Sequence, residues 1–315
     1  MSIHWCNVVF LMTNDQSQIL VSIVCITYNH APYLRKALEG FLMQKTGFPV
    51  EIILAEDCST DGTRSICEEY AENYPDTIRY IWSDTNVGAV ENEARALRAS
   101  RGKYIALCEG DDYWTNPLKL QKQVDFMEAH PEYSVTFHRY KIHYDDTDTW
   151  ENDNAEKLFM GSDIEGLDIT MEQSLNVWLT QYLTAVFRRD CYDFTWADKY
   201  QWYRDSHMFY HLMTCGKAYL FAFEGGVYRK TGNGIYTNMD QYHTQLRTIE
   251  VCREMWEKND DERLKEPYAK ALQYFVDSFN GEHTLRKKVL RASKDLYALT
   301  RQTKQYFKNI WKILV

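Results

Sequence analysis

The chain has 315 residues, of which 45% are hydrophobic and 26% are charged, proportions that are ordinary for a globular protein with one large or two small domains. Its net charge of −9 argues against general binding of nucleic acid, because such proteins present positive charge to the phosphate backbone. Eight cysteines occur without a C-x-x-C pair, which favours buried, reduced thiols in a cytoplasmic protein over a disulfide framework or a zinc site.

The first 18 residues are interpreted as a leader segment ahead of the folded part. Residues 1–11 are mildly apolar but lack the basic start and the long apolar core of a signal peptide. Met12, which polar residues follow, is a second candidate for the start of the chain. No apolar run is long enough to predict a membrane-spanning helix.

Strand and helix patterns alternate through the first 130 residues. Short apolar, β-branched runs predict buried strands, and segments with one apolar face and capping residues predict helices. The predicted strands are 21–26, 52–55, 78–82 and 104–107, and the predicted helices are 32–42, 62–74, 90–100 and 117–130. This alternation predicts an α/β fold with a parallel sheet and helices on its faces.

Polar residues directly follow three of these strands. They are Thr27-Tyr28, Glu56-Asp57 and Glu109-Gly110-Asp111-Asp112. Ligands of parallel sheets bind at the carboxyl ends of the strands, so we expect these residues to line the same edge.

The third of these turns crowds three carboxylates into four residues. Glu109, Asp111 and Asp112 resist ionisation beside one another, and a divalent cation would relieve their repulsion because hard cations bind carboxylate oxygens. The alternative is a solvated acidic turn that caps the helix after Asn116-Pro117. The residues alone leave both interpretations open.

The second half of the chain has weaker patterns. Residues 133–144, 186–187 and 218–221 are strand-like, and residues 204–215 predict a helix that ends at Gly216. The acidic stretch 145–168 is interpreted as a mobile loop, and the chain is helical from about Gln241.

Five segments carry a resemblance to a known family. In order they are VSIVCITYNHAPYLRKAL, EIILAEDCSTDGT, NVG, RGKYIALCEGDDYW, and RDSHMFYHLMTCGK followed by VYR. Over residues 19–236 they resemble family 2 glycosyltransferases of the GT-A fold. The resemblance implies a Rossmann-like, mainly parallel sheet in residues 19–240 and a helical extension in residues 241–315. It also implies a nucleotide-sugar donor, Mn²⁺ or Mg²⁺ as cofactor, and inversion at the anomeric carbon.

The resemblance assigns donor binding to residues at the strand ends. Asp57 corresponds to the carboxylate that accepts a hydrogen bond from the base, and an acceptor there favours the imide N–H of uracil. A Tyr28 ring stacked on the base has the alternative of packing on the adjacent helix, and Asp61 is interpreted as a helix cap. The residues expected to bind the donor are Thr27, Tyr28, Asn29, Asp57, Asn86, Gly88, Asp111 and Arg229.

The metal ligands implied by the resemblance are Asp111 first, then Asp112, and Glu109 in the place of the family's first Asp. Such a cation would bridge the diphosphate of the donor. Trp114 is expected either to line the sugar pocket or to pack in the core.

Asp205 corresponds to the family's catalytic base, which takes the proton of the acceptor hydroxyl. A helix N-cap is the alternative, and Arg204 departs from the small or acidic residue expected before it. Arg229 is expected to bind phosphate or to be an ordinary surface cation. His207 and His211 have metal-like spacing, but no third ligand supports zinc.

The carboxyl-terminal stretch 285–315 holds nine basic residues and one acidic residue, with apolar residues every three or four positions. This pattern predicts a basic amphipathic helix in peripheral contact with the inner face of an anionic membrane. The alternatives are packing on the acidic domain of the same chain or on a second subunit.

These observations favour an inverting glycosyltransferase that moves a sugar, with UDP as the expected nucleotide, to a hydroxyl of a glycan or lipid-linked glycan. Assembly of bacterial surface polysaccharide is the setting that the resemblance implies. A non-catalytic nucleotide-sugar-binding scaffold is the main alternative. A nucleotidyltransferase is disfavoured because the loop after the first strand has no glycine.

Overall fold

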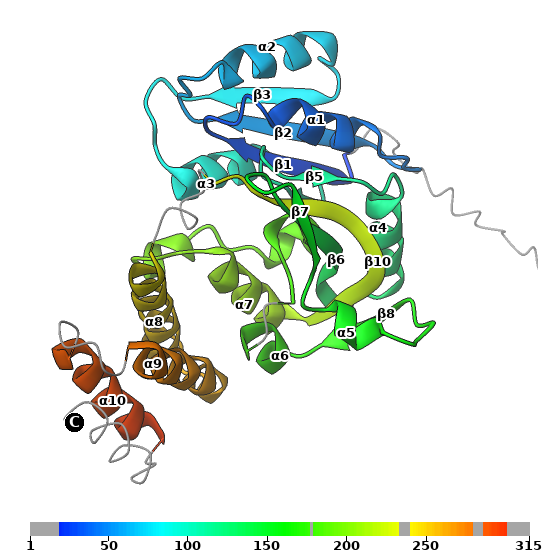
Figure 1. Cartoon of the computed structure of the whole chain (residues 1–315). Helices are drawn as coiled ribbons and strands as arrows, with labels where there is room; N and C mark the ends of the chain where they lie inside the picture. The colour runs from blue at the N-terminus through cyan, green and yellow to red at the C-terminus, as the bar shows by residue number, and fades with distance from the viewer. Residues whose placement is uncertain (1–18, 177–178, 233–239, 280–285, 301–315) are drawn as a thin grey trace, which may run out of the picture.

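In a computed structural model the protein is described over residues 19–176, 179–232, 240–279 and 286–300 (Figure 1). Its first part alternates between strands and helices, as predicted. In chain order these are β1 (Val21–Thr27), α1 (Leu34–Leu42), β2 (Val50–Glu56), α2 (Thr63–Asn73), β3 (Ile78–Trp82), α3 (Ala89–Ala99) and β4 (Tyr104–Leu107). The four strands pair in parallel in the order β3-β2-β1-β4.

The second part extends this sheet in mixed directions. It contains β5 (Tyr113–Trp114), α4 (Lys119–Ala129), β6 (Tyr133–Tyr144), β7 (Thr149–Asn152), α5 (Glu156–Phe159), β8 (Gly166–Ile169), α6 (Met171–Asn176), β9 (Val186–Arg188), α7 (Asp205–Cys215) and β10 (Lys217–Lys230). The complete order is β3-β2-β1-β4-β9-β6-β10-β5. The short strand β9 lies antiparallel between β4 and β6 and joins the two halves.

The prediction of a loop over residues 145–168 was wrong for part of that stretch. β7 pairs with β6 as an antiparallel hairpin, and β8 pairs with β10. All four residues of β7 are exposed, so the strand has no buried face to produce an alternating pattern. Phe159 and Ile169 nevertheless anchor the stretch in the core.

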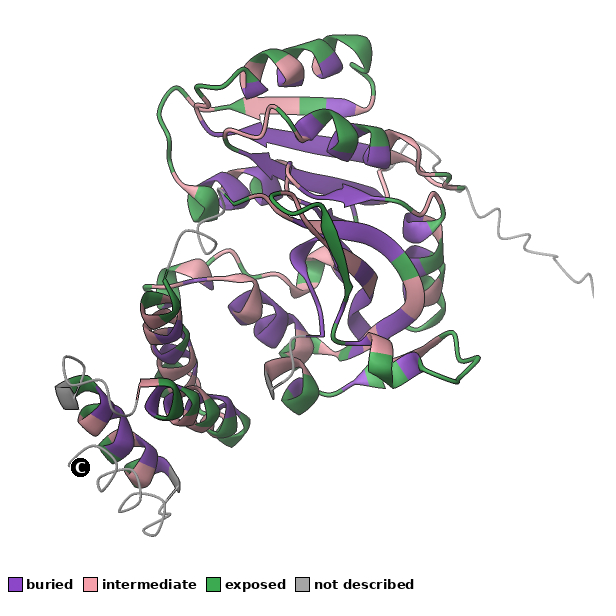
Figure 2. Ribbon diagram, viewed as in Figure 1, coloured by how far each residue is buried: buried purple, intermediate pink, exposed green. Residues whose placement is uncertain are grey.

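The central strands of the sheet are largely buried (Figure 2), and a hydrophobic core lies on each face of the sheet. Along β1, Val21, Ile23 and Cys25 pack toward α1, α2 and α4, whereas Val24 and Ile26 pack toward α3 and α7. Both sides of the strand are buried, which explains its continuous apolar run.

The cysteines are free in the described part of the chain. Cys25, Cys67 and Cys108 are buried as predicted, but Cys215 is exposed. None of the described helices is long and apolar enough to cross a lipid bilayer.

The carboxyl-terminal region forms the helices α8 (Gln241–Lys258), α9 (Lys265–Phe279) and α10 (Arg286–Thr300). The apolar face of α10 is buried against the other two helices in a cluster that contains Val289, Leu296, Leu272 and Phe275. The amphipathic pattern of residues 286–300 is thus explained by packing within the chain, the alternative to membrane burial. Residues 301–315 of the predicted membrane segment lie outside the described residues.

Helix α7 buries two histidines that stay neutral. Burial lowers the pKa of His207 from 6.5 to about 3 and that of His211 to about 4. The His207 Nδ1 atom accepts the backbone N–H of Arg204 at 3.1 Å, and the His211 Nε2 atom lies 2.8 Å from the Tyr200 hydroxyl. Among the described residues neither belongs to a group of three candidate metal ligands.

We expect acid to destabilise the protein through these histidines. As the pH is lowered from about 7.5 to about 5, the histidines of the unfolded chain bind protons but the buried imidazoles of the folded protein do not. Each histidine should therefore lower the free energy of unfolding by about 2 kcal/mol. Urea unfolding of His207→Gln should show a correspondingly shallower fall than the parent protein. His130→Gln is the control, since that side chain is 47% exposed, and an equal fall in all three proteins would contradict the prediction.

Candidate functional site

The loops that follow β1, β2 and β4 meet at one edge of the sheet. The backbone N–H of Asp57 donates to the Thr27 carbonyl at 3.1 Å, and that of Gly110 donates to the Ile26 carbonyl at 3.0 Å. A Cβ atom on Gly110 would lie only 2.7 Å from the Thr27 Oγ1 atom, so a larger residue would push the acidic turn away from β1. The predicted convergence of these three turns is therefore present.

Side chains lock the first two of these loops together. Asn29, whose φ is +54°, accepts the backbone N–H of Thr60 at 2.8 Å through its side-chain oxygen. Asp61 accepts the N–H of Thr63 at the start of α2 and that of Ala31 in the first loop, both at 3.0 Å. Asp61 thus supports the start of α2, although Gly62 occupies the N-cap position, and the Asn29 amide oxygen shapes the loop.

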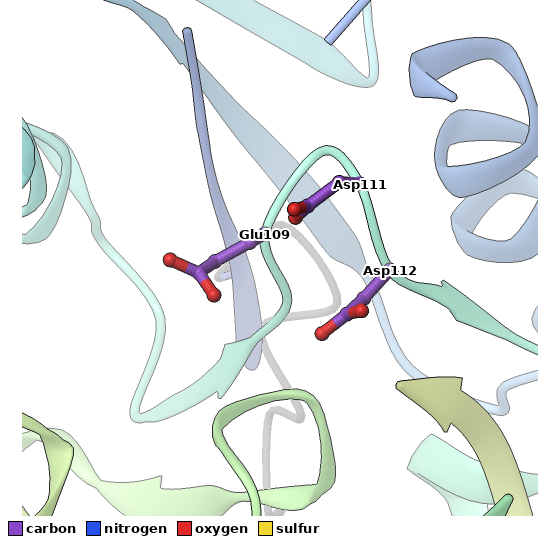
Figure 3. Close-up of side chains that lie close together, drawn as sticks. All are labelled: Glu109, Asp111 and Asp112. Carbon is purple, nitrogen blue, oxygen red and sulfur yellow. The ribbon is translucent and has the colours of Figure 1, made fainter. Parts of the chain in front are cut away.

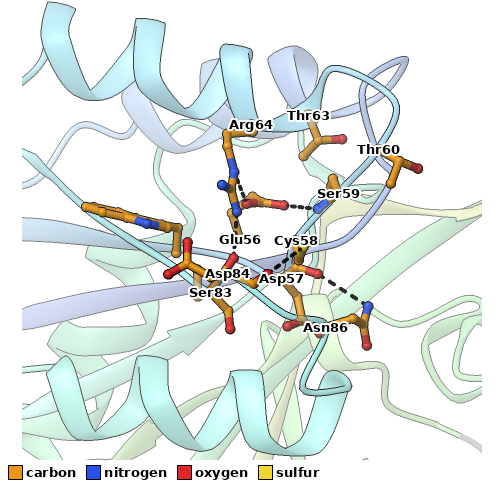
Figure 4. A network of polar contacts seen from close by, with 12 residues as sticks. Glu56, Asp57, Cys58, Ser59, Thr60, Thr63, Arg64, Ser83, Asp84 and Asn86 are labelled. Carbon is orange, nitrogen blue, oxygen red and sulfur yellow. Dashed lines mark hydrogen bonds and ion pairs between the residues drawn. The ribbon is translucent and has the colours of Figure 1, made fainter.

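The neighbouring acids Glu56 and Asp57 have different partners (Figure 4). The buried Glu56 carboxylate pairs with Arg64 at 2.8 Å. Asp57 accepts the backbone N–H groups of Val87 and Gly88 at 2.8 and 2.9 Å, one on each carboxylate oxygen. Asp57 therefore shapes the third loop of the edge, and each of its oxygens still has a free lone pair.

Thr27, Asn86 and Gly88, three other expected donor residues, contact Asp57. The Asn86 side-chain amide donates to the Asp57 carbonyl at 3.3 Å, and Gly88 adopts a φ of +85° that favours glycine. Thr27 is buried and its hydroxyl has no hydrogen-bond partner among the described residues, whereas Tyr28 is 44% exposed. Tyr28 thus leaves a large part of its ring open for stacking at this edge.

We expect Asp57→Asn to loosen this edge and weaken nucleotide binding. The amide nitrogen of Asn would face a backbone N–H that it cannot accept, at a cost of about 1–3 kcal/mol for the unpaired group. The melting temperature and the affinity for UDP, measured by calorimetry, should both fall. Asp84→Asn is the matched control, because Asp84 is exposed on the same loop. UDP affinity equal to the parent's would contradict a donor-binding role for Asp57.

The three acids after β4 gather their carboxylates around one point (Figure 3). One oxygen each of Glu109, Asp111 and Asp112 lies within 4.8 Å of the others. Asp112 is buried; one of its oxygens accepts the Arg229 N–H at 2.7 Å, and the other has no partner among the described residues. Burial and then mutual repulsion raise the pKa of both Glu109 and Asp112 well above the ordinary range. An orphaned oxygen on a buried carboxylate, beside two half-buried acids, fits a divalent cation and argues against a solvated turn.

Arg229 is a buried support of this cluster. Its guanidinium donates to the Asp111 carbonyl at 2.9 Å and lies 3.5 Å from a carboxylate oxygen of Asp145. The rings of Tyr33 and Tyr113 lie 4.7 and 4.9 Å from its central carbon. The interpretation of Arg229 as a surface cation was therefore wrong, since only 8% of its side chain is exposed.

Asp205 is the first residue of α7, and Arg204 occupies the N-cap position. One carboxylate oxygen accepts the N–H of Ser206 at 2.8 Å, and burial raises the pKa of the Asp205 carboxyl. The charge of Asp205 also contributes to the raised pKa of Glu109, so the two carboxylates lie within electrostatic reach of each other. The structure thereby places Asp205 near the acidic cluster.

The sequence analysis did not identify a fifth acid near the cluster, Glu93 on α3. It is buried and accepts the Tyr182 hydroxyl at 2.6 Å. Burial raises the pKa of Glu93 to about 7, and the charge of Asp205 adds to this effect. The available signal was its position on the same inward face of α3 as Ala96 and Leu97, where a charged residue is unusual.

Trp114 belongs to the core. It is 2% exposed, and its indole N–H donates to the Leu183 carbonyl at 2.8 Å. Of the two interpretations of this residue, packing is the one that the structure supports.

Comparison with known proteins assigns the family. A model described as glycosyl transferase family 2 matches residues 22–194. An uncharacterized protein of Mycobacterium tuberculosis is 53% identical over 126 residues, which cover 40% of this chain and 36% of that protein. The putative teichuronic acid biosynthesis glycosyltransferase TuaG of Bacillus subtilis is 36% identical over 34% of this chain and 42% of its own length. The matches thus span less than half of these relatives.

Solved structures share the fold at low identity. TarS 1–349 of S. aureus, solved in complex with UDP-GlcNAc, has a TM-score of 0.62 and 16% identity over 89% of this chain and 81% of its own. The mannosyltransferase PcManGT of Pyrobaculum calidifontis, in complex with GDP-Man and Mn²⁺, has a TM-score of 0.52 and 15% identity over 94% of this chain and 85% of its own. Because the family model spans more than half of a chain that folds as a GT-A domain, this protein belongs to glycosyl transferase family 2.

Proposed function

We propose that the protein is an inverting glycosyltransferase that moves a sugar from a nucleoside diphosphate sugar to a hydroxyl acceptor. The observation that carries this proposal is the partly buried cluster of Glu109, Asp111 and Asp112, with an orphaned oxygen on the buried Asp112 and with Asp205 within electrostatic reach. A fold that served only to bind a nucleotide sugar would need no such carboxylate beside its metal-binding residues.

The donor is proposed to bind at the edge formed by the first three loops. Thr27, Tyr28 and Asn29 would contact the nucleoside. Each oxygen of Asp57 already accepts one backbone N–H, so the imide N–H of uracil would be accepted by a remaining lone pair. Asn86 and Gly88 contribute through the loop that Asp57 holds. UDP is the proposed nucleotide.

Glu109, Asp111 and Asp112 are proposed to hold Mn²⁺ or Mg²⁺. When bound, the cation neutralises the charge that develops on the departing nucleoside diphosphate. Arg229 keeps Asp111 and Asp112 in place through its bonds to the Asp111 carbonyl and to the Asp112 carboxylate. This role replaces direct contact with phosphate as the function of Arg229.

Asp205 is proposed to take the proton of the acceptor hydroxyl as that oxygen attacks the anomeric carbon. Its burial at the amino end of α7 raises its pKa, which makes it a stronger base once it is ionised. Its bond to the Ser206 N–H leaves the second carboxylate oxygen available to the acceptor hydroxyl.

The test is a thermal-shift screen of UDP-, GDP- and dTDP-sugars with and without Mn²⁺, followed by turnover of whichever donor binds. A metal-dependent shift with a UDP-sugar, followed by release of UDP, is the expected outcome. A shift without turnover on a broad panel of hydroxyl acceptors would instead favour the scaffold function. No shift with any nucleotide sugar would refute both.

The acceptor is proposed to be a glycan or lipid-linked glycan in bacterial surface polysaccharide assembly. The name of the relative TuaG, which refers to teichuronic acid biosynthesis, supports this setting. We place the enzyme in the cytoplasm, with peripheral membrane contact through the exposed cations of α10, Lys288, Arg291 and Lys294. We further propose residues 19–240 as the catalytic domain and residues 241–315 as its helical extension.

This membrane contact predicts salt-sensitive sedimentation with anionic vesicles. Exposed cations attract anionic lipid by about 1 kcal/mol each, so neutralising Lys288, Arg291 and Lys294 together should abolish sedimentation at low salt. Neutralising Arg98, Lys103 and Lys270, which form ion pairs with acidic residues, is the control. Equal sedimentation of the two triple variants would rule out contact through α10.

A further inference from the structure

The hairpin of β6 and β7 presents an exposed indole ring. Trp150 is 52% exposed and pairs across the hairpin with His143. The two rings stack with centroids 4.3 Å apart and planes inclined by 27°. One face of the indole thus lies on the imidazole, while more than half of the residue stays open to solvent.

Two carboxylates fix the ring beneath this indole. The His143 Nδ1 atom lies 3.0 Å from an oxygen of Asp145, and its Nε2 atom lies 2.9 Å from an oxygen of Asp148. The side chain of His143 is only 16% exposed, whereas that of Asp148 is 90% exposed. The imidazole therefore has a fixed orientation, and Asp148 offers free acceptor positions at the edge of the imidazole on which the indole stacks.

The same contacts connect the hairpin to the acidic cluster. Asp145, which holds His143, lies 3.5 Å from Arg229. Arg229 in turn bonds to Asp112 and to the Asp111 carbonyl. A hydrogen bond to Asp145, after the effect of burial, also raises the pKa of Tyr33. The hairpin is thus held to the site by a continuous chain of polar contacts.

We propose that Trp150 and Asp148 form an acceptor subsite for a neutral pyranose unit. This inference rests on the proposed glycosyltransferase function. A pyranose has a face of C–H groups that packs on an aromatic ring and a rim of hydroxyls that donate to a carboxylate. A uronic acid unit is disfavoured because Asp148 and Glu151 are exposed at this end of the hairpin and would repel its carboxylate, whereas the charge of Asp145 is already paired with Arg229.

Cross-strand aromatic pairs also stabilise hairpins, and this simpler role explains the stacking by itself. Hairpin stabilisation does not explain why the exposed carboxylate of Asp148 lies on the Nε2 atom of His143. It also does not explain the ion pair between Asp145 and Arg229. The two roles differ in a measurable way, since only a subsite contacts sugar.

Saturation-transfer NMR with neutral tetrasaccharides, cellotetraose and chitotetraose, tests the subsite without any donor. Trp150→Ala should lose the transfer signal at the sugar C–H protons, and Trp150→Phe should keep it. Trp82→Ala is the matched control, because Trp82 is 55% exposed at the other edge of the sheet, on β3. Tetragalacturonate should give no signal with the parent protein. An unchanged signal in Trp150→Ala, or no signal from the parent with either neutral sugar, overturns the proposal.

A kinetic measurement links the subsite to transfer. For an acceptor that is turned over, Trp150→Ala should raise the acceptor KM about tenfold, the loss of roughly 1.4 kcal/mol of stacking and burial. Trp150→Phe should recover most of it, and the nucleotide-sugar thermal shift should keep its size. If sugar binding depends on Trp150 but no nucleotide sugar binds, the subsite stands and the proposed function fails. An acceptor KM in Trp150→Ala equal to the parent's counts against the subsite, whereas donor turnover alone supports only the proposed function.

Discussion

Asp205→Asn is expected to lower kcat for sugar transfer by about 10²- to 10⁴-fold, the usual contribution of a general base. Asn has nearly the same shape, and its oxygen can still accept the Ser206 N–H, but it cannot take up the proton of the acceptor hydroxyl. Donor binding should change little, because Asp205 is not among the residues proposed to hold the nucleotide or the cation. Single-turnover assays with saturating donor measure the loss directly.

The pH dependence gives an independent check of this role. Asp205 must be ionised to act as a base, so activity should rise with pH through its pKa. Because burial raises this pKa, the midpoint of the rise in activity should lie at a pH above 3.8, the ordinary pKa of an aspartic acid. Asp198→Asn serves as the control, since that acid is exposed in a 3₁₀ turn outside the site. Activity of Asp205→Asn within a few fold of the parent would refute the assignment.

Loss of activity must also be separated from loss of structure. A carboxylate at the first turn of a helix stabilises the helix dipole by about 0.3–1 kcal/mol, and Asn gives up part of this. The raised pKa of Asp205 shows that its ionised form is disfavoured by burial, so a neutral side chain should be tolerated. The melting temperature of Asp205→Asn is thus expected to lie close to that of the parent.

The sequence predicted the first half of the fold well because local patterns determine it. β1, β2 and β4 are short apolar runs buried on both faces, and the helices between the strands have inward apolar stripes. The alternation of strands and helices predicted where the strands end. It also predicted that Thr27, Asp57 and Asp111 converge at one edge of the sheet. Every predicted helix and strand of this half lies within two residues of the observed one.

The second half depends on contacts that no local pattern reveals. β9 has three residues, and its place between β4 and β6 is fixed by tertiary pairing alone. β10 is 14 residues long, and irregular pairing near Glu224 interrupts its alternation, so only residues 218–221 were recognised. The burial of Arg229 requires Tyr33, Tyr113 and Asp145 from three other segments. The sequence analysis therefore left Arg229 as a phosphate ligand or a surface cation, whereas the fold makes it a buried support.

Asp112→Asn is expected to produce opposite effects with and without a divalent cation. Without metal, the parent confines a buried carboxylate with one unpaired oxygen beside Glu109 and Asp111, and burial followed by repulsion raises the pKa of Asp112. Asn removes that charge and still accepts the Arg229 N–H, so the metal-free variant should melt at a higher temperature than the metal-free parent. Adding Mn²⁺ at about a hundred times its dissociation constant should stabilise the parent by about 2.7 kcal/mol and the variant much less.

This reversal in the order of the two melting temperatures on addition of Mn²⁺ separates metal binding from a merely structural role for the acids. A structural carboxylate would give a variant that is less stable in both conditions, and a solvated acidic turn would give two proteins that Mn²⁺ does not distinguish. Asp125→Asn is the matched control, because Asp125 lies on α4 and its side chain is exposed, where it accepts a bond from Gln121. The same argument predicts that chelation of the metal abolishes transfer in the parent, since the carboxylates of Glu109, Asp111 and Asp112 would then repel the diphosphate that the cation is needed to hold.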